Sequence, residues 1–556
     1  MGIKRVLTGV VAFCSLFALA SCDIEVKVKD TTKGKTTQGV TTTGRTKTGY
    51  FTTRSKTNGN TSTSNSTTAN QTTNGGHVTT RPRPTTTKKV TTQTQGQTIR
   101  FYCWNDEFQS RFRKYYGDSQ QLADGTDMLS DGTKIQWTMA ANTGNVYQQT
   151  LDIVLENGLC DMFCFEADYA KKYVDSQYAV DLSTLGLNLS RQYQYVKDIA
   201  TNSAGKIVGT SWQACPDVIC YNENVAKLLF PTESDYSIEA MQQKLGTRTA
   251  FDATALQLES IDHEYAMIIG PYSWCRPYQC NLSQKMYNSS TKTITIDKKY
   301  FQYAYDTKNY NTKGYLLGDT NDYCLWGKYD KWYSGFTANS KALTVFSTTW
   351  FNDFIITEKH TKTIDDGFGN SITYICGGCP ADENGGSPYR VVEGFEPSFW
   401  GGTWIAPTTY GVSNNTKKAA ITSILSKMTT DKNTSRAISD EFLDFTNNID
   451  AMDEKANDAN FESTYFGGQN IYGIYSSVAK KISMANNSIV DFIAMDWFKQ
   501  AFLPYIQGTK AASACWLDFE QWLKNGSLSY FYNVSFSDCT VNASSDVQIG
   551  EDITFI

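Results

Sequence analysis

The residues of this sequence best placed to do chemistry are aromatic residues that stand next to an amide or a carboxylate residue. The 556-residue chain has 33 Tyr and 12 Trp, and its 13% aromatic share is high for a generic soluble domain. Such an excess predicts a surface that stacks on a flat partner. Trp104-Asn105 and Asp168-Tyr169 each place a ring next to a hydrogen-bonding side chain. These two pairs are therefore candidate binding residues.

Histidine chemistry has little support in this chain. Of three histidines, His77 lies in a polar N-terminal segment, which leaves His263 and His360 for any triad or histidine-rich metal site. His263-Glu264 is not followed by a second histidine at the spacing of a zinc protease helix. No G-x-x-x-x-G-K-[ST] motif occurs, so any ATP hydrolysis must belong to a separate partner.

Cysteine spacing does not predict a metal site. Cys376-Gly-Gly-Cys379 is the one CxxC pair, and it lacks a second pair or histidines nearby, which favours a local disulfide or two free thiols over zinc. Cys160 and Cys164 lie four apart in an apolar strand pattern and should face one side as small core residues. The sequence leaves the pairing of the cysteines open. We expect neither a metal nor another cofactor.

Alternating strand and helix patterns must position the candidate residues. Strands are predicted over 99–104, 135–139, 161–165 and 218–221, and helices follow residue 105, over 146–158, from 168 to 174 and up to residue 230. This order favours an α/β fold with mostly parallel sheets. In such sheets ligands bind beyond the carboxyl ends of the strands. Trp104-Asn105 and Asp168-Tyr169 both fall at that edge.

The N-terminus has the pattern of a secretory signal. Lys4 and Arg5 precede an apolar stretch over 6–19, and small residues lead into Cys22. The stretch is shorter than the roughly 20 apolar residues of a membrane span. Residues 19–22 resemble a bacterial lipobox, which implies that Cys22 is acylated and becomes the new N-terminus. The alternative is an ordinary cleaved signal with an accidental cysteine.

Residues 23–98 are rich in Thr, Ser, Gly and Asn, and predict a disordered tether. The tether has 12 basic and 3 acidic residues, a net charge of +9, whereas residues 99–556 have 37 basic and 53 acidic residues, a net of −16. A basic tether suits an anionic envelope, although its lysines could also merely solvate it. The acidic head argues against a nucleic-acid partner.

Five stretches of the head resemble the extracellular solute-binding proteins of carbohydrate ABC transporters, the large type related to maltodextrin-binding protein. Together they follow the family's order over most of residues 99–510, and Thr349-Trp350-Phe351 resembles a further turn. They are Trp104-Asn105-Asp106-Glu107-Phe108, Phe165-Glu166-Ala167-Asp168-Tyr169-Ala170, Gly209-Thr210-Ser211-Trp212-Gln213-Ala214, Phe399-Trp400-Gly401-Gly402-Thr403-Trp404 and Phe466-Gly467-Gly468-Gln469-Asn470.

The resemblance implies a two-lobed periplasmic-binding-protein type 2 α/β fold with a central ligand cleft. Lobe 1 is expected over about 99–212 and 402–455, and lobe 2 over about 213–401 and 456–540. The chain should cross between the lobes near Trp212, near Trp400 and near residue 455. The tyrosine-rich region 286–347 keeps little of the family pattern, so its role stays open.

The resemblance also assigns candidate sugar-binding residues. A sugar ring has a weakly apolar face for an aromatic ring and a rim of hydroxyls for amide or charged groups. The candidates for the face are Trp104, Trp212, Trp350, Trp400, Trp404, Tyr169 and Tyr472. The candidates for the rim are Asn105, Glu107, Asp168, Gln213 and Gln469, and Gly401 and Gly402 would let backbone approach the ligand.

Each assignment has a structural alternative. Trp350 and Trp404 could be core residues, and Glu107 could compensate a helix dipole. Asp168 could cap a helix, and Gly401-Gly402 could form a turn away from any ligand.

The expected function is that of a monomeric, lipid-anchored binding component of an importer, and not that of an enzyme. It would capture a carbohydrate outside the cell, close around it and deliver it to permease subunits that work with a separate ATPase. The alternatives are an exported carbohydrate-active enzyme, for which no local motif selects a carboxylate pair, and a surface adhesin without a small ligand.

Overall fold

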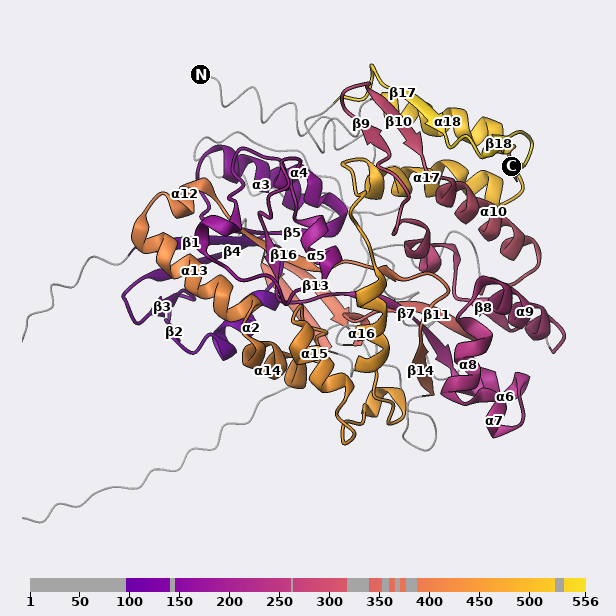
Figure 1. The fold of residues 1–556 in the computed structure, drawn as a ribbon, viewed down its shortest axis with the longest axis horizontal. Helices are drawn as coiled ribbons and strands as arrows, with labels where there is room; N and C mark the ends of the chain where they lie inside the picture. Colours follow the sequence, from indigo (N-terminus) through magenta and orange to yellow (C-terminus); the bar gives the residue numbers. More distant parts are fainter. Residues whose placement is uncertain are drawn as a thin grey trace, which may run out of the picture. The chain divides into compact units, whose positions relative to one another are not determined.

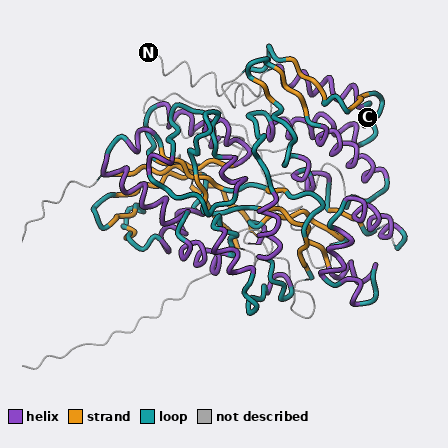
Figure 2. Tube along the Cα trace, viewed as in Figure 1, coloured by secondary structure: helices purple, strands orange, loops and turns teal. Residues whose placement is uncertain are grey.

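The computed structural model describes residues 97–140, 146–261, 264–317, 340–352, 388–525 and 535–556, and the backbone of two strands at 360–365 and 371–376. The chain divides into two units, Met1–Lys88 and Lys89–Ile556, and every described residue belongs to the second unit (Figures 1 and 2). The predicted signal, Cys22 and nearly all of the tether lie outside the described residues.

A seven-stranded sheet forms the centre of the first lobe. Its order is β2 (Ser119–Gln121), β3 (Asp127–Leu129), β4 (Lys134–Met139), β1 (Thr98–Cys103), β5 (Met162–Glu166), β16 (Thr403–Pro407) and β6 (Thr210–Ser211). Strand β1 pairs in parallel with β4 and with β5, as the periodicity predicts. Figure 1 shows α3 (Val146–Glu156) and α4 (Ala170–Val174) on one side of this sheet and α13 (Asn415–Thr429) on the other.

The second lobe has a sheet of its own, with the order β14 (Tyr389–Val392), β7 (Pro216–Asn222), β11 (Ala342–Thr348) and β8 (Ala266–Ile268). Strand β7 pairs antiparallel with β14, with β11 and with the short β15 (Ser398–Phe399). In the first sheet β16 also runs antiparallel to β5 and β6. The prediction of mostly parallel sheets is therefore wrong. The neighbouring strands β2, β3 and β4 pair antiparallel, and strands that return from distant parts of the sequence enter both sheets in the opposite direction.

The chain changes sheet at two of the predicted positions. Residues 212–215 lead from β6 into β7, and residues 400–402 lead from β15 back into β16. Gly401 and Gly402 have φ angles of 74° and 102°, a region that favours glycine. At the third predicted position, near residue 455, α15 (Ile449–Ala456) packs against α14 (Lys432–Phe442) and against α16 (Tyr472–Lys481), which in turn contacts β7.

The remaining elements follow the local sequence patterns. Asn222, Ser237, Thr247, Asp297, Asn414, Asp431 and Asn448 each accept a hydrogen bond from the backbone of the helix that they begin. Further α-helices of the described part are α2 (Glu107–Tyr115), α5 (Gln194–Ile199), α6 (Glu223–Leu229), α7 (Glu233–Tyr236), α8 (Ile238–Leu245), α9 (Arg248–Glu259), α10 (Lys298–Thr312), α12 (Thr409–Val412), α17 (Asp491–Ile506) and α18 (Ala512–Lys524). None of the helices in the described ranges has the length and apolar character needed to cross a membrane.

Part of the region with the doubtful role, 286–347, packs into the second lobe. Strand β10 (Thr293–Ile296) lies between β9 (Tyr287–Asn288) and β17 (Thr540–Ala543), and α10 packs against α17. Tyr300 and Phe301 are fully buried and meet Phe498 edge to face. The tyrosines of this segment that the structure describes therefore include core residues, while residues 318–339 lie outside the described part.

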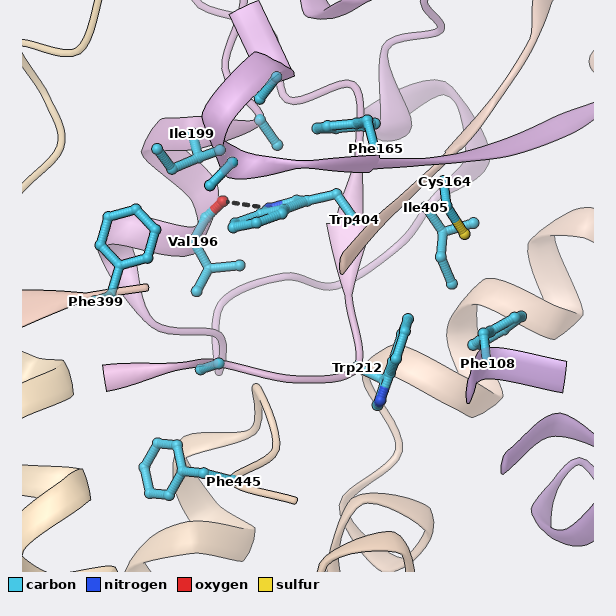
Figure 3. Packing of buried hydrophobic residues seen from close by; sticks show 14 of the residues in the cluster. Phe108, Cys164, Phe165, Val196, Ile199, Trp212, Phe399, Trp404, Ile405 and Phe445 are labelled. Carbon is cyan, nitrogen blue, oxygen red and sulfur yellow. Dashed lines mark hydrogen bonds between the residues drawn. The ribbon is translucent and has the colours of Figure 1, made fainter. Parts of the chain in front are cut away.

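Two hydrophobic cores stabilise these sheets, and tryptophans occupy central places in the first (Figure 3). Trp404 is 1% exposed, stacks on Phe165 with ring centroids 6.1 Å apart and donates from Nε1 to the Val196 carbonyl at 2.9 Å. Trp212 is also 1% exposed and packs on Phe108 at 5.2 Å. Burial of such large rings, with the polar atom of Trp404 bonded, contributes strongly to the core.

Nine cysteines lie in the described part with their side chains, and all are buried. The prediction that Cys160 and Cys164 are small core residues is confirmed, since each is 1% exposed. Cys379 and the side chain of Cys376 lie outside the described residues, so the CxxC prediction stays a prediction.

Gly411 lies where α12 packs tightly against the start of β5. A Cβ at this position would lie 2.4 Å from the backbone oxygen of Asp161, whereas a Cβ at Gly473 in α16 would meet nothing within 4 Å. We expect Gly411→Ala to lower the free energy of unfolding by about 1–3 kcal/mol. Gly473→Ala should leave it unchanged or raise it by up to about 1 kcal/mol. Equal denaturant midpoints for the two variants would contradict this packing.

Candidate ligand-binding site

The carboxyl ends of β1 and β5 bring the first group of candidate residues to one edge of the first sheet. Because the two strands are parallel and paired, the residues that follow them lie at the same edge. Trp104 and Asn105 follow β1, and Asp168 and Tyr169 form a 3₁₀ turn directly after β5. The antiparallel β16 begins at this edge, where Thr403 pairs with Glu166. We use the name strand-end group for Trp104, Asn105, Asp168 and Tyr169 together with Trp400, Gly401 and Gly402.

An ion pair joins this edge to the second lobe. Arg276 lies in a 3₁₀ turn (Arg276–Tyr278) that packs against β15, and its Nη1 and Nη2 donate to the two carboxylate oxygens of Asp168 at 2.8 and 3.0 Å. The Arg276 residue is 7% exposed, and its guanidinium carbon lies 5.1 Å from the ring centre of Trp400. A bidentate pair of this kind fixes both distance and orientation between its two elements.

Glu166 is a partly buried acid beside this ion pair. Burial, together with the negative charge of Asp168, raises the pKa of Glu166 to about 8, although the Arg276 cation opposes the shift. The Glu166 carboxyl group is therefore mostly protonated at neutral pH. In that form it can donate as well as accept a hydrogen bond.

Two indoles, those of Trp350 and Trp400, contact each other beside Gly401. Trp350 donates from Nε1 to the Trp400 carbonyl at 3.1 Å, and the two rings meet at 73° with centroids 5.3 Å apart. Both indoles are partly exposed, so part of each ring surface remains open to solvent. A Cβ on Gly401 would lie 3.1 Å from Trp350 Nε1 and 3.8 Å from Glu166 Oε1. Glycine at this position therefore keeps the space between the indole and the acid open.

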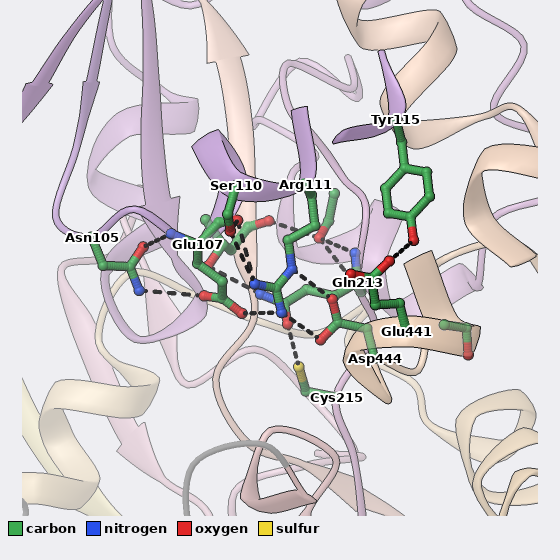
Figure 4. Close-up of polar contacts among 12 residues, drawn as sticks. Asn105, Glu107, Ser110, Arg111, Tyr115, Gln213, Cys215, Glu441 and Asp444 are labelled. Carbon is green, nitrogen blue, oxygen red and sulfur yellow. Dashed lines mark hydrogen bonds and ion pairs between the residues drawn. The ribbon is translucent and has the colours of Figure 1, made fainter. Parts of the chain in front are cut away.

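Asn105 and Glu107 belong to a polar network at the start of α2 (Figure 4). Asn105 Nδ2 donates to Glu107 Oε2 at 3.3 Å, and Glu107 lies 3.8 Å from the buried guanidinium of Arg111. Arg111 also donates to both carboxylate oxygens of Asp444, at 3.0 and 3.2 Å. Glu107 thus lies in the first turn of α2 and has a buried cation as a partner.

The first crossing segment contains Gln213 in a buried network. Gln213 Nε2 donates to Thr403 Oγ1 at 3.2 Å, and the Cys215 thiol donates to Gln213 Oε1 at 3.7 Å. Ser211 Oγ donates to the Thr403 carbonyl at 2.7 Å. These bonds tie the segment 211–215 to the beginning of β16, so the two crossings support each other.

The other predicted residues have different surroundings. Trp212 and Trp404 are buried in the core, and Trp104 is 9% exposed with its ring edge-on to Tyr147 at 5.2 Å. Tyr472 is fully buried, and its hydroxyl interacts with Ser439. Gln469 forms two hydrogen bonds with the backbone of Val391 in β14, at 2.7 and 2.8 Å. Tyr472 and Gln469 therefore bond to elements other than the strand-end group.

Glu166, Arg276, Arg111 and Asp444 were not predicted as site residues. Glu166 lies in one of the five stretches that resemble the solute-binding family, at the end of the apolar strand, and this position is a usable signal. Arg276 is a cation inside the aromatic segment Tyr272–Tyr278, which is an unusual setting for a charge. The pairing of Arg111 with Asp444 spans 333 residues of sequence and has no local signal.

Several polar atoms near this edge have no hydrogen-bond partner among the described residues. They are Tyr169 Oη, Trp212 Nε1, Arg276 Nε and Asp217 Oδ1. Burial raises the pKa of Asp217 to about 7, while the nearby Arg276 opposes the shift. Unpaired buried polar atoms are uncommon in folded proteins and point to groups that a ligand or water can satisfy. In the described part no three His, Cys, Asp or Glu residues are grouped so that they could hold a metal ion.

Comparisons with known proteins place the fold. No family model matches the sequence, and no curated protein does. A solved extracellular solute-binding protein of family 1 matches with a TM-score of 0.57 and 16% identity, over 79% of this chain and 100% of its own. An ABC transporter-associated binding protein from B. animalis subsp. lactis, solved in complex with β-1,6-galactobiose, matches with a TM-score of 0.52 and 13% identity, over 80% of this chain and 100% of its own.

The sugar-binding protein MalE from Xanthomonas citri is a third similar structure, with a TM-score of 0.51, 10% identity, and coverage of 79% of this chain and 98% of its own. These matches include almost the whole length of each solved protein and most of the head of this chain. The chain therefore has the two-lobed α/β fold of the extracellular solute-binding proteins, as the sequence predicts.

Proposed function

We propose that this protein is the substrate-binding component of an ABC importer that captures a carbohydrate between its two lobes. In this proposal Cys22 carries the lipid anchor, the head works as a monomer on the extracytoplasmic face of the cell membrane, and the closed form delivers the sugar to permease subunits with a separate ATPase. The protein itself performs no catalysis. The proposed ligand is an oligosaccharide, since several aromatic rings are available to stack on successive sugar rings.

The observation that carries this proposal is the joining of Asp168 to Arg276 beside Trp400. One partner follows a strand of the first lobe, the other belongs to the second lobe, and a partly exposed indole lies against the guanidinium. A sugar placed here would find a ring for its apolar face and charged groups for its hydroxyls. The solved structure with galactobiose is a protein of the same fold with a sugar ligand, which supports the same class for this chain.

Glu166 adds a donor that an ionised carboxylate could not provide. With a pKa of about 8 it keeps its proton at neutral pH and can donate a hydrogen bond to a hydroxyl or ring oxygen of a sugar. Asp168, in the strand-end group, and the Gln213 amide, in the first crossing segment, offer acceptor oxygens. The site would thus match the mixed donor and acceptor character of a sugar rim.

Closure would follow from contacts that only the closed form makes. If the sugar bonds to groups of both lobes, its higher affinity for the closed form shifts the equilibrium toward closure. The Asp168–Arg276 pair would favour the same form, because it bridges the lobes. Small-angle scattering with the cognate sugar should therefore show a smaller radius of gyration than without it, and an unchanged radius would exclude closure.

A thermal-shift screen of mono- and oligosaccharides tests the proposed function directly. A reversible rise in the unfolding temperature with an intact sugar supports a binding component, because a ligand that binds only the folded state stabilises it. Turnover of the same sugar by the purified protein would instead identify an enzyme. Neither effect across a broad panel would favour an adhesin.

Trp400 and Trp404 form a matched pair of variants, four residues apart in one segment. Trp400→Ala should weaken binding of the sugar found in the screen by about tenfold or more, or about 1.4 kcal/mol, because it removes a partly exposed ring from the strand-end group. Trp404→Ala should lower the free energy of unfolding by about 3–5 kcal/mol, because this ring is 1% exposed in the core. Calorimetric titration and denaturant unfolding of both variants measure the two effects. Unimpaired binding by a folded Trp400→Ala protein would remove Trp400 from the site.

Glu166→Gln tests the raised pKa. Between the ordinary pKa of 4.5 and the folded value of about 8, folded Glu166 keeps a proton that the unfolded chain has lost, so rising pH destabilises the wild type through this group. Glutamine cannot titrate, so the stability of the variant relative to wild type should increase from about pH 4.5 to about pH 8 and then level off. Denaturant unfolding over this range measures the difference, with Glu551→Gln at an exposed position as control. A flat difference for Glu166→Gln would contradict the shifted pKa.

A further inference from the structure

Two buried cysteines lie on neighbouring strands directly below the candidate site. Strands β1 and β5 are parallel, with Phe101 paired to Met162 and Tyr102 to Phe163. Continuing this register by one residue places Cys103 beside Cys164. Both are 1% exposed, and both point into the same core.

The strand register brings the backbones of the two cysteines side by side. The Cys103 Sγ donates to Met139 Sδ at 3.1 Å. Paired strands are about 4.8 Å apart, and a disulfide needs a Cα separation of roughly 4.4–6.8 Å. The backbone positions of the two cysteines therefore allow a bond once the Cys103 side chain turns from Met139 toward Cys164.

We propose that Cys103 and Cys164 form a disulfide when the chain folds in the presence of a small-molecule disulfide such as oxidised glutathione. The thiolate of one cysteine attacks a sulfur of the oxidant, forms a mixed disulfide and releases one reduced thiol. The second cysteine then attacks the first cysteine's sulfur, forms the Cys103–Cys164 bond and releases the second reduced thiol. The two protons of the cysteines pass to the two leaving thiolates, and the oxidant takes up the two electrons.

The timing of this reaction follows from burial. Burial raises the pKa of the Cys164 thiol well above its ordinary value, so the packed protein holds little of the reactive thiolate. The bond should therefore form while the strands assemble and only slowly afterwards. An exported protein folds where such oxidants persist, so this inference also agrees with the predicted signal.

The bond would act on the segments that carry candidate binding residues. Cys103 directly precedes Trp104, and Cys164 lies four residues before Asp168. A disulfide here would hold the ends of β1 and β5 together and restrict the unfolded chain between them. The oxidised protein should therefore unfold at a higher denaturant concentration than the reduced protein.

Peptide mapping tests the proposal. The full chain is reduced and unfolded, refolded with reduced and oxidised glutathione, alkylated in denaturant and digested without reduction. Mass spectrometry should find the Cys103 peptide linked to the Cys164 peptide, with a mass two hydrogen atoms below the sum of the two thiol peptides. Finding both cysteines alkylated, or either one linked to another cysteine, would overturn the proposal.

Cys160 provides the matched control. It is also 1% exposed and precedes the same strand, but the register places Ile99 opposite to it. Cys160→Ser should therefore keep the linked peptide and its effect on stability, whereas Cys103→Ser should leave Cys164 alkylated and remove that effect. If Cys103→Ser does not fold, the mapping of wild type and Cys160→Ser still decides the question. The result is independent of whether a sugar binds.

Discussion

The pair formed by Asp168 and Arg276 connects the two lobes, and the arrangement of the candidate site depends on it. Arg276 is a buried cation that needs a carboxylate, because a charge left unpaired in such surroundings is strongly destabilising. Its two donor nitrogens bind both oxygens of Asp168, which fixes the end of β5 relative to the second lobe. The same guanidinium lies against Trp400 and counteracts the pKa rise of Glu166. One interaction thus contacts an indole, influences the protonation of an acid and connects the two lobes.

The crossing segments make this arrangement possible. The chain passes between the sheets at residues 212–215 and again at 400–402, and hydrogen bonds from Ser211 and Gln213 to Thr403 hold the two passages together. Positive φ angles at Gly401 and Gly402 let the second passage turn close to Trp350 and Trp404. A side chain at Gly401 would fill the space between an indole and Glu166. The two glycines therefore allow both the turn of the backbone and the open space in the site.

Local periodicity predicted the elements that position the site. The alternation before Trp104 and the apolar run before Asp168 correctly indicated β1 and β5, and the rule that ligands lie beyond strand ends placed both residues at one edge. The antiparallel entry of β16 could not be predicted in this way, because it pairs with a strand some 240 residues earlier and the direction of pairing leaves no trace in a short stretch. For the same reason the sequence did not reveal Arg276 as the partner of Asp168, or Asp444 as the partner of Arg111. The sequence also does not distinguish a core tryptophan such as Trp404 from a partly exposed one such as Trp400. Both lie in the same short stretch of glycine and aromatic residues.

A double-mutant cycle on sugar affinity tests the central interaction most directly. The dissociation constant of the stabilising sugar is measured calorimetrically for wild type, Asp168→Asn, Arg276→Gln and the double variant. If the pair brings the lobes together around the ligand, the losses of the single variants are not additive, with a coupling of about 1 kcal/mol or more. Additive losses, or affinities equal to that of wild type, would contradict the account.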